Sequence, residues 1–129
     1  MLFRSNHDAQ LHNVQTFHPR HSFNVNISTP GEHDETFAFA SGIRQPYRIT
    51  CAFHGAMRAW VFVFDHPWYQ VTGKDGNFLL ADVPPGEYSL ELVHPAGELR
   101  AARLIAVKPG ETLAVDFHLG PDDKLAAQP

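Results

Sequence analysis

Three different metal-donor groups lie at three-residue spacing in the segment Cys51-Ala52-Phe53-His54-Gly55-Ala56-Met57. They are a thiolate, an imidazole and a thioether, and they lie in a short loop between two predicted strands. Soft sulfur donors suit reduced copper, whereas imidazole nitrogens are tolerated by both oxidation states of the metal. A trigonal site of two histidines and one cysteine, with a long axial methionine, uses this mixture. The loop therefore predicts copper binding by Cys51, His54 and Met57.

Such a site needs a second imidazole from another part of the chain. His12, in Leu11-His12-Asn13-Val14, is the best placed, because it begins a predicted strand that can pack beside the loop. His7 and His18 are close rivals for the same role. We expect Asn13 to bond the Cys51 sulfur or to join the two ligand segments, a contact that would orient the ligands and tune the metal.

Simpler interpretations exist for several of these residues. Cys51 is the only cysteine, so it could also be a buried small hydrophobe or a reactive thiol. Met57 could fill a gap in the core. His66 and His94 each precede a proline, and capping or solvent exposure explains both. Phe53 is either a loop anchor or part of an apolar surface beside an exposed imidazole.

The remaining histidines and the large aromatic residues are better explained by structure than by chemistry. The chain has nine histidines, which favours a metal site without locating it. Those in polar stretches are expected to be solvated surface imidazoles: His18, His21 and His33. We assign the aromatic residues around the run 59–64 to packing: Trp60, Phe62, Phe64 and Trp68.

Composition and patterning predict an all-β protein. The chain has 129 residues, with 9 glycines and 10 prolines, and it shows no long amphipathic helical pattern. The apolar run 59–64 favours a central strand and is the strongest core candidate. Turn residues separate the strands that we expect, which are 11–17, 22–27, 35–40, 47–51, 59–64, 69–72, 78–80, 88–94, 104–107 and 113–119.

Taken together, these motifs resemble a known family. Phe3, Asn6 and Asp8 precede His12-Asn13-Val14, and the ligand loop then leads into Asp65, Pro67 and Tyr69. This order is similar to the bacterial plastocyanin/azurin-like proteins often labelled methylamine utilization protein. In that family a cupredoxin-like region continues into a carboxypeptidase regulatory-like β module. The second module is matched by Val71-Thr72, Asp75-Gly76, Phe78, Val83-Pro84-Pro85-Gly86, Tyr88, Leu90 and His94.

The resemblance implies a fold, a domain layout and a ligand set. Residues 1–65 would form a cupredoxin-like Greek-key β-sandwich, and residues 66–120 a small carboxypeptidase regulatory-like or transthyretin-like β-sandwich. Residues 121–129 would be a disordered tail. The copper ligands would be His12, Cys51, His54 and Met57, and the protein would be periplasmic or extracellular.

The chain departs from the family in two places. Gly55 stands where the family usually has proline, which would loosen the ligand loop. The strands that ordinarily precede the Asn6/Asp8 segment are missing, which implies an N-terminally truncated sandwich without its first strands. We expect a sheet edge left open in this way to favour association.

Charge and motif content exclude several functions. The formal net charge is -4 and no lysine/arginine cluster occurs, which argues against binding nucleic acid or anionic membranes. The chain contains no apolar run long enough to span a bilayer. It also lacks a nucleophile elbow and a glycine-rich phosphate loop, so we do not expect an enzyme.

Three functions stay open from the sequence. The first is one-electron transfer by a type 1 copper site to and from a redox partner protein. The second is copper handling or sequestration with the same ligands. The third is a metal-free β-sandwich module that contacts proteins or glycans through its C-terminal half.

Overall fold

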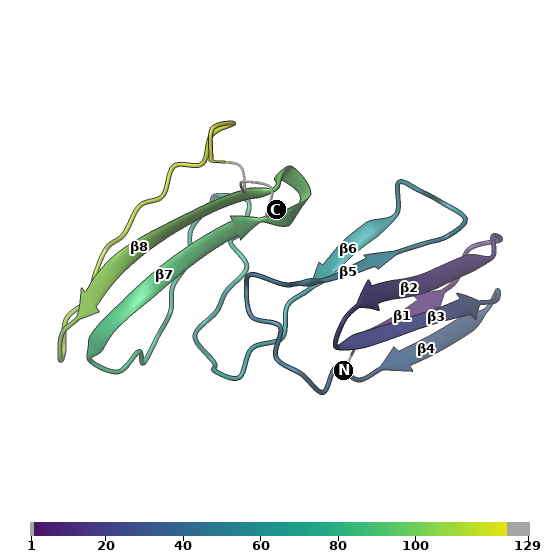
Figure 1. Cartoon of the computed structure of the whole chain (residues 1–129), viewed down its shortest axis with the longest axis horizontal. Coiled ribbons are helices and arrows are strands. Elements are labelled where there is room, and N and C mark those ends of the chain that lie inside the picture. Colours follow the sequence, from purple (N-terminus) through teal and green to yellow (C-terminus); the bar gives the residue numbers. More distant parts are fainter. Residues whose placement is uncertain (1, 124–129) are drawn as a thin grey trace. The chain divides into compact units, whose positions relative to one another are not determined.

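The computed structural model describes residues 2–123 and shows an all-β chain with antiparallel sheets (Figure 1). The chain divides into two compact units, Met1–Asp65 and His66–Pro129, and each is described by itself. In the described part of the chain, no helix has the length and apolar character needed to cross a membrane.

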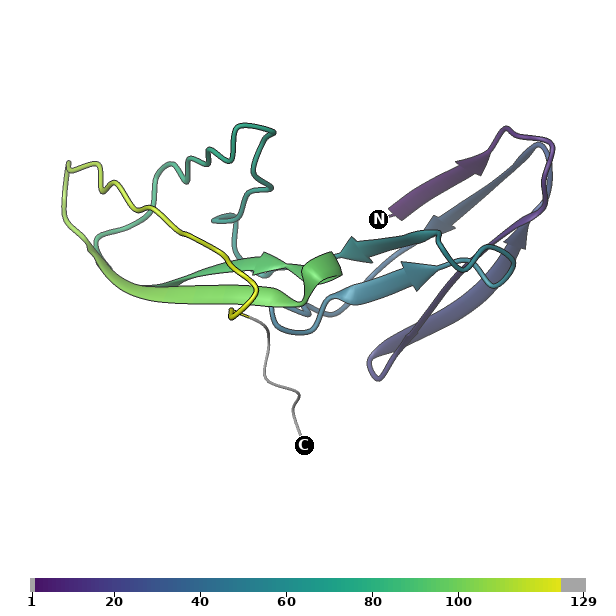
Figure 2. The same ribbon diagram turned by 90° about the horizontal axis from the view of Figure 1, so that it is seen from above.

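Unit 1 contains a four-stranded sheet in the order β3-β2-β5-β6 and a separate antiparallel pair, β1 with β4. Figure 2 shows the β1–β4 pair lying over the four-stranded sheet as a second layer, an arrangement consistent with a β-sandwich. The strands are β1 Leu2–Asn6, β2 His12–His18, β3 His21–Ile27, β4 Gly31–Glu35, β5 Tyr47–Thr50 and β6 Arg58–Val61.

The β2–β3 hairpin follows the predicted alternation. His12 pairs with Ile27 at the open end and His18 with His21 at the turn. Along β3 the side chains of Phe23, Val25 and Ile27 are more buried than their neighbours, which are exposed. The expected strands 11–17, 22–27 and 47–51 are confirmed to within one residue at each end.

The core of unit 1 is built on its larger sheet. Its buried apolar side chains come from the strands of the larger sheet, and each contributes about 1.5–3 kcal/mol by leaving water. The layers are also joined by polar contacts, since the Asn6 side chain donates a hydrogen bond to the Ile27 carbonyl over 3.1 Å. The buried apolar cluster is Val14, Ile27, Tyr47 and Ile49.

Two strand predictions in unit 1 are wrong. The run 59–64 is not a central strand, because β6 ends at Val61 and is the last strand of its sheet. The expected strand 35–40 is irregular after Glu35, and its pairing is made instead by Gly31–Glu35 with β1. Phe37 still packs inward, with its ring 4.6 Å from that of Tyr47.

The three histidines expected to be solvated are partly buried instead. The His18 ring lies 4.2 Å from the Tyr47 ring. His21 and His33 both contact Glu35, with nitrogen to oxygen distances of 2.7 and 2.9 Å. Glu35 therefore joins β3 to β4, and these imidazoles belong to the sandwich rather than to its solvated surface.

Unit 2 is built on one long antiparallel hairpin, β7 Gly86–His94 and β8 Leu99–Val107, joined through the 3-10 turn Pro95–Gly97. His94 caps this turn, as expected, because its Nδ1 accepts a hydrogen bond from the Gly97 amide over 3.0 Å. The predicted strands 69–72, 78–80 and 113–119 are wrong, since all three segments are irregular.

Packing in unit 2 is looser than in unit 1. Between residues 66 and 123 no side chain is fully buried, so the aromatic residues there do not form a closed core. Trp68, expected to pack, donates its indole N–H to the Asp82 carbonyl over 3.3 Å. In the predicted tail, Asp123 accepts a hydrogen bond from the Arg100 amide over 2.9 Å, and residues 124–129 lie outside the described part.

Candidate metal centre

Strand pairing brings the two ligand segments to the same end of the larger sheet. β2 and β5 are antiparallel, with Gln15 opposite Thr50. The start of β2, where His12 lies, therefore meets the end of β5, which Cys51 directly follows. His54 lies on the loop from β5 to β6, so all three side chains come from one corner of unit 1 (Figure 1).

His12, Cys51 and His54 form a compact group of donor atoms. One ring nitrogen of each histidine and the cysteine sulfur all lie within 4.8 Å of one another. The Cys51 sulfur is 3.6 Å from Nδ1 of His54, and the two imidazole centroids are 4.8 Å apart. The structure thus gathers three of the four predicted ligands, in an arrangement that could hold a metal ion.

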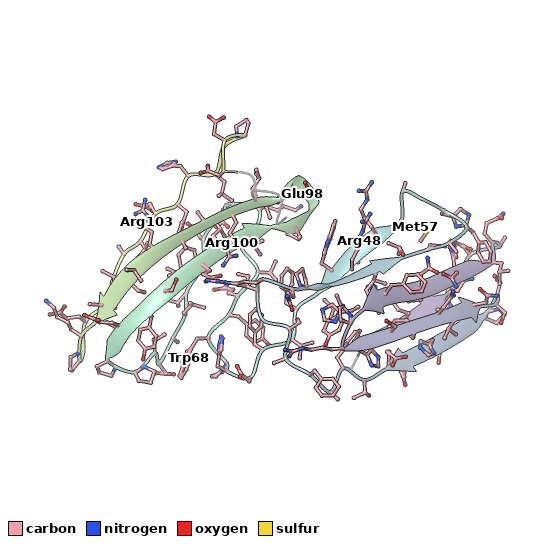
Figure 3. All side chains as sticks on the ribbon, in the orientation of Figure 1. Arg48, Met57, Trp68, Glu98, Arg100 and Arg103 are labelled. Carbon is pink, nitrogen blue, oxygen red and sulfur yellow. The ribbon has the colours of Figure 1, made fainter. Side chains whose placement is uncertain are left out.

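Met57 is held close to this group by the backbone of its loop. Its amide donates to the His54 carbonyl over 2.9 Å, and its carbonyl accepts from the Cys51 amide over 3.3 Å. Figure 3 shows Met57 on the segment that leads into β6. Its side chain is 46% exposed and lines one concave surface together with His12 and Cys51. Axial binding by Met57 stays a prediction.

Asn13 connects the two ligand segments. Its backbone amide donates to the Cys51 sulfur over 3.4 Å, and its side-chain oxygen accepts from the Ala52 amide over 3.2 Å. Its side-chain nitrogen contacts oxygen atoms of Asn24, Val25 and Asn26 at 2.5 to 3.2 Å. Both contacts expected of Asn13 are present, and its burial on β2 makes it a rigid link between strand and loop.

Asp8 is a site residue that the sequence reasoning did not assign. Its Oδ2 lies 2.6 Å from Nε2 of His12. The other ring nitrogen of His12, Nδ1, is buried and has no hydrogen-bond partner among residues 2–123. In the sequence, the only signal for this contact was that Asp8 precedes His12 by four residues.

Hydrogen bonds control the electrostatics of the group. Burial raises the pKa of the Cys51 thiol, but hydrogen bonds from the Asn13 and Phe53 amides and the neighbouring imidazoles of His12 and His54 outweigh it and lower that pKa to about 6. The bond to Asp8 raises the pKa of His12, and the same bond lowers the pKa of Asp8. A thiolate is therefore available near neutral pH, as metal binding requires.

Neither rival histidine belongs to the three-residue group. His18 is at the opposite end of β2, against Tyr47. His7 is exposed and lines the same concave surface as His12, but it is not in the three-residue group.

No protein-family model, curated protein or solved structure matches this chain. The chemistry of the site is therefore argued from its own geometry. The sulfur of Cys51 and one nitrogen each of His12 and His54 form a group that could hold a metal ion.

Proposed function

We propose that unit 1 is a cupredoxin-like domain with a type 1 copper site, and that the protein transfers single electrons. The observation that carries this proposal is the convergence of the Cys51 sulfur with one nitrogen each of His12 and His54, within 4.8 Å. The sequence order of the four predicted ligands, histidine, cysteine, histidine and methionine, supports the proposal, as does the resemblance to plastocyanin/azurin-like proteins.

Copper is favoured over other ions by the donor set. A single thiolate with two imidazoles leaves room for a weak thioether, which Met57 would supply from the same loop. A structural zinc site generally uses four strong ligands, usually with more than one cysteine when sulfur is involved. The described residues near Cys51 offer no such fourth strong donor.

Each ligand would have its own part in electron transfer. Cys51 is buried and would provide the strongest electronic coupling to the metal. His54 is only partly buried and would face a partner protein. His12 would be the inner imidazole, oriented by its strand.

The surface around His54 is suited to transient docking. Residues 52, 53 and 55–57 are exposed and uncharged, and Phe53 is 52% exposed. A small apolar surface without like charges permits brief contact between redox proteins, whose interfaces are usually small. We propose a redox partner protein and an exported compartment, and no chemical change in a substrate.

A copper titration tests the proposal. Adding one equivalent of Cu(II) to the purified full-length protein should produce an intense visible thiolate-to-copper charge-transfer band. Cys51→Ser should abolish that band while circular dichroism shows the same β fold. His7→Ala is the matched control, because His7 is exposed and borders the same surface, and its removal should leave the colour intact.

The outcomes separate the alternatives. A blue band with fast electron self-exchange supports electron transfer, whereas a blue band with very slow exchange favours copper sequestration. A wild-type protein that stays colourless with Cu(II), or a Cys51→Ser variant that turns blue, contradicts the type 1 assignment.

A further inference from the structure

We infer that Asp8 is a positioning residue for the copper site: its carboxylate fixes the ring of His12 and favours the oxidised ion. This inference rests on the proposed function. The geometry behind it is the short contact of 2.6 Å between Asp8 Oδ2 and Nε2 of His12.

The carboxylate is itself held by its loop. Its Oδ1 accepts a hydrogen bond from the Gln10 amide over 2.8 Å, which leaves Oδ2 to face the imidazole. The Asp8 amide donates to Oδ1 of Asn6 over 3.2 Å. The buried Asn6 side chain is in turn anchored on the Gln10 carbonyl at 2.7 Å. These hydrogen bonds hold the Asp8 carboxylate in a defined position facing His12.

The contact determines which His12 nitrogen can bind a metal. Because an ionised carboxylate only accepts hydrogen bonds, Nε2 must carry the proton when the ring is neutral, and Nδ1 then carries the lone pair that can bind a metal. Nδ1 is the buried nitrogen that lacks a hydrogen-bond partner in the described chain. The lone pair is thus presented on the side of the ring away from Asp8, and one nitrogen of this ring lies within 4.8 Å of the Cys51 sulfur.

The charge of Asp8 has a second effect. A carboxylate that accepts a hydrogen bond from a metal-binding imidazole increases the basicity of that ligand. Its negative charge also interacts more favourably with Cu(II) than with Cu(I). Asp8 would therefore lower the reduction potential of the site and keep His12 bound during electron transfer.

We expect substitutions of Asp8 to leave the fold intact. Its side chain is 58% exposed, and an ion pair at such a position adds little to stability. Asp8→Asn keeps an oxygen acceptor for Nε2 but removes the charge, whereas Asp8→Leu removes both. Asp34→Asn is a matched control, since Asp34 is an exposed acid on β4.

The first measurement needs no copper. Long-range ¹H–¹⁵N NMR of protein treated with chelator should show His12 as the Nε2–H tautomer in the wild type, in Asp8→Asn and in Asp34→Asn. Asp8→Leu should shift His12 towards a mixture of tautomers. An unchanged tautomer in Asp8→Leu overturns the inference.

The second measurement uses the copper protein. Asp8→Leu should weaken Cu(II) binding by about 10 to 100-fold, the usual loss for such supporting residues. Asp8→Asn should weaken the binding of Cu(II) more than the binding of Cu(I). A tenfold change in the ratio of the two affinities raises the reduction potential by about 59 mV. If Asp8→Asn and Asp8→Leu both keep the reduction potential and copper affinity of the wild type, the role of Asp8 is contradicted. The proposed copper site itself is not affected by that result. Failure of the wild type itself to bind copper instead overturns the proposed function and this inference together.

Discussion

The backbone amide of Asn13 donates a hydrogen bond to the Cys51 sulfur over 3.4 Å, although the two residues lie 38 positions apart in the chain. The Asn13 side chain adds a second link, to the Ala52 amide. One residue on β2 therefore stabilises the thiolate and orders the loop that carries it, so the stability of the sheet and the chemistry of the site depend on the same contacts.

The Cys51 thiol should ionise at unusually low pH. Its pKa of about 6 means that the thiolate fraction rises as the pH passes through that value, whereas an ordinary thiol titrates near 8.5. In chelator-treated protein, the rate of modification by a small methanethiosulfonate should therefore reach half its maximum near pH 6. His12→Gln should move that midpoint upward, because the neighbouring imidazole that favours the thiolate is lost. A wild-type midpoint above 8 would contradict the hydrogen-bonded thiolate.

Asn13→Ala should destabilise unit 1. The change leaves the Ala52 amide and β3 acceptors without their partner in a buried position, which costs about 1–3 kcal/mol in the free energy of unfolding. Urea denaturation followed by Trp60 fluorescence, in a Trp68→Phe background, would measure it.

Asn26→Ala is the comparison for that experiment, because Asn26 is exposed and Asn13 keeps its other contacts. Its effect should stay within about 0.5 kcal/mol. Equal losses for the two variants would show that the Asn13 side chain has no special structural role.

Ile49→Ala should lower stability and also disturb the site. Ile49 is 5% exposed in the core of unit 1, and removing such a side chain costs about 2–5 kcal/mol. β5 leads directly into Cys51, so a loosened strand should also raise the thiol reactivity at fixed pH. Phe17→Ala, at a position 74% exposed on β2, should cost about 1 kcal/mol or less in the same denaturation assay. An Ile49 variant as stable as this control would argue against the assigned core.

Gly55 and Gly31 should respond oppositely to alanine. A Cβ at Gly55 meets no atom within 4 Å, so Gly55→Ala should stiffen the ligand loop and raise stability by about 0.4–1 kcal/mol. A Cβ at Gly31 would lie 2.6 Å from the Ser28 carbonyl oxygen, so Gly31→Ala should destabilise the fold by about 1–3 kcal/mol. Thermal denaturation of the two variants and the wild type would measure both changes in stability. A destabilised Gly55→Ala would mean that the loop needs the freedom of glycine.

Local patterns predicted the elements whose pairing is local. The apolar patterns were enough to indicate strands at 11–17 and 22–27, which pair in the structure as the β2–β3 hairpin. The β1–β4 pair joins residues far apart in the chain, and nothing in Leu2–Asn6 signalled a strand. An apolar run such as 59–64 shows that side chains avoid water, but it does not show whether neighbours lie on both sides.

The site was more predictable than the second unit. Donor chemistry and spacing identified Cys51 and His54, and strand placement favoured His12 over His7 and His18. Asp8 was missed because its role depends on how the 6–12 loop turns, which spacing alone does not reveal. In unit 2 the alternating segments 69–72 and 113–119 resemble strands, yet they have no strand partner within residues 66–123.

The two ligand segments meet only when β2 and β5 have paired, since His12 and the Cys51 loop are far apart in the sequence of unit 1. An ion held by both would bind the folded chain and not the unfolded one, which shifts the folding equilibrium by mass action. If that ion is the proposed copper, the metal-loaded chain should resist unfolding and proteolysis better than the metal-free chain.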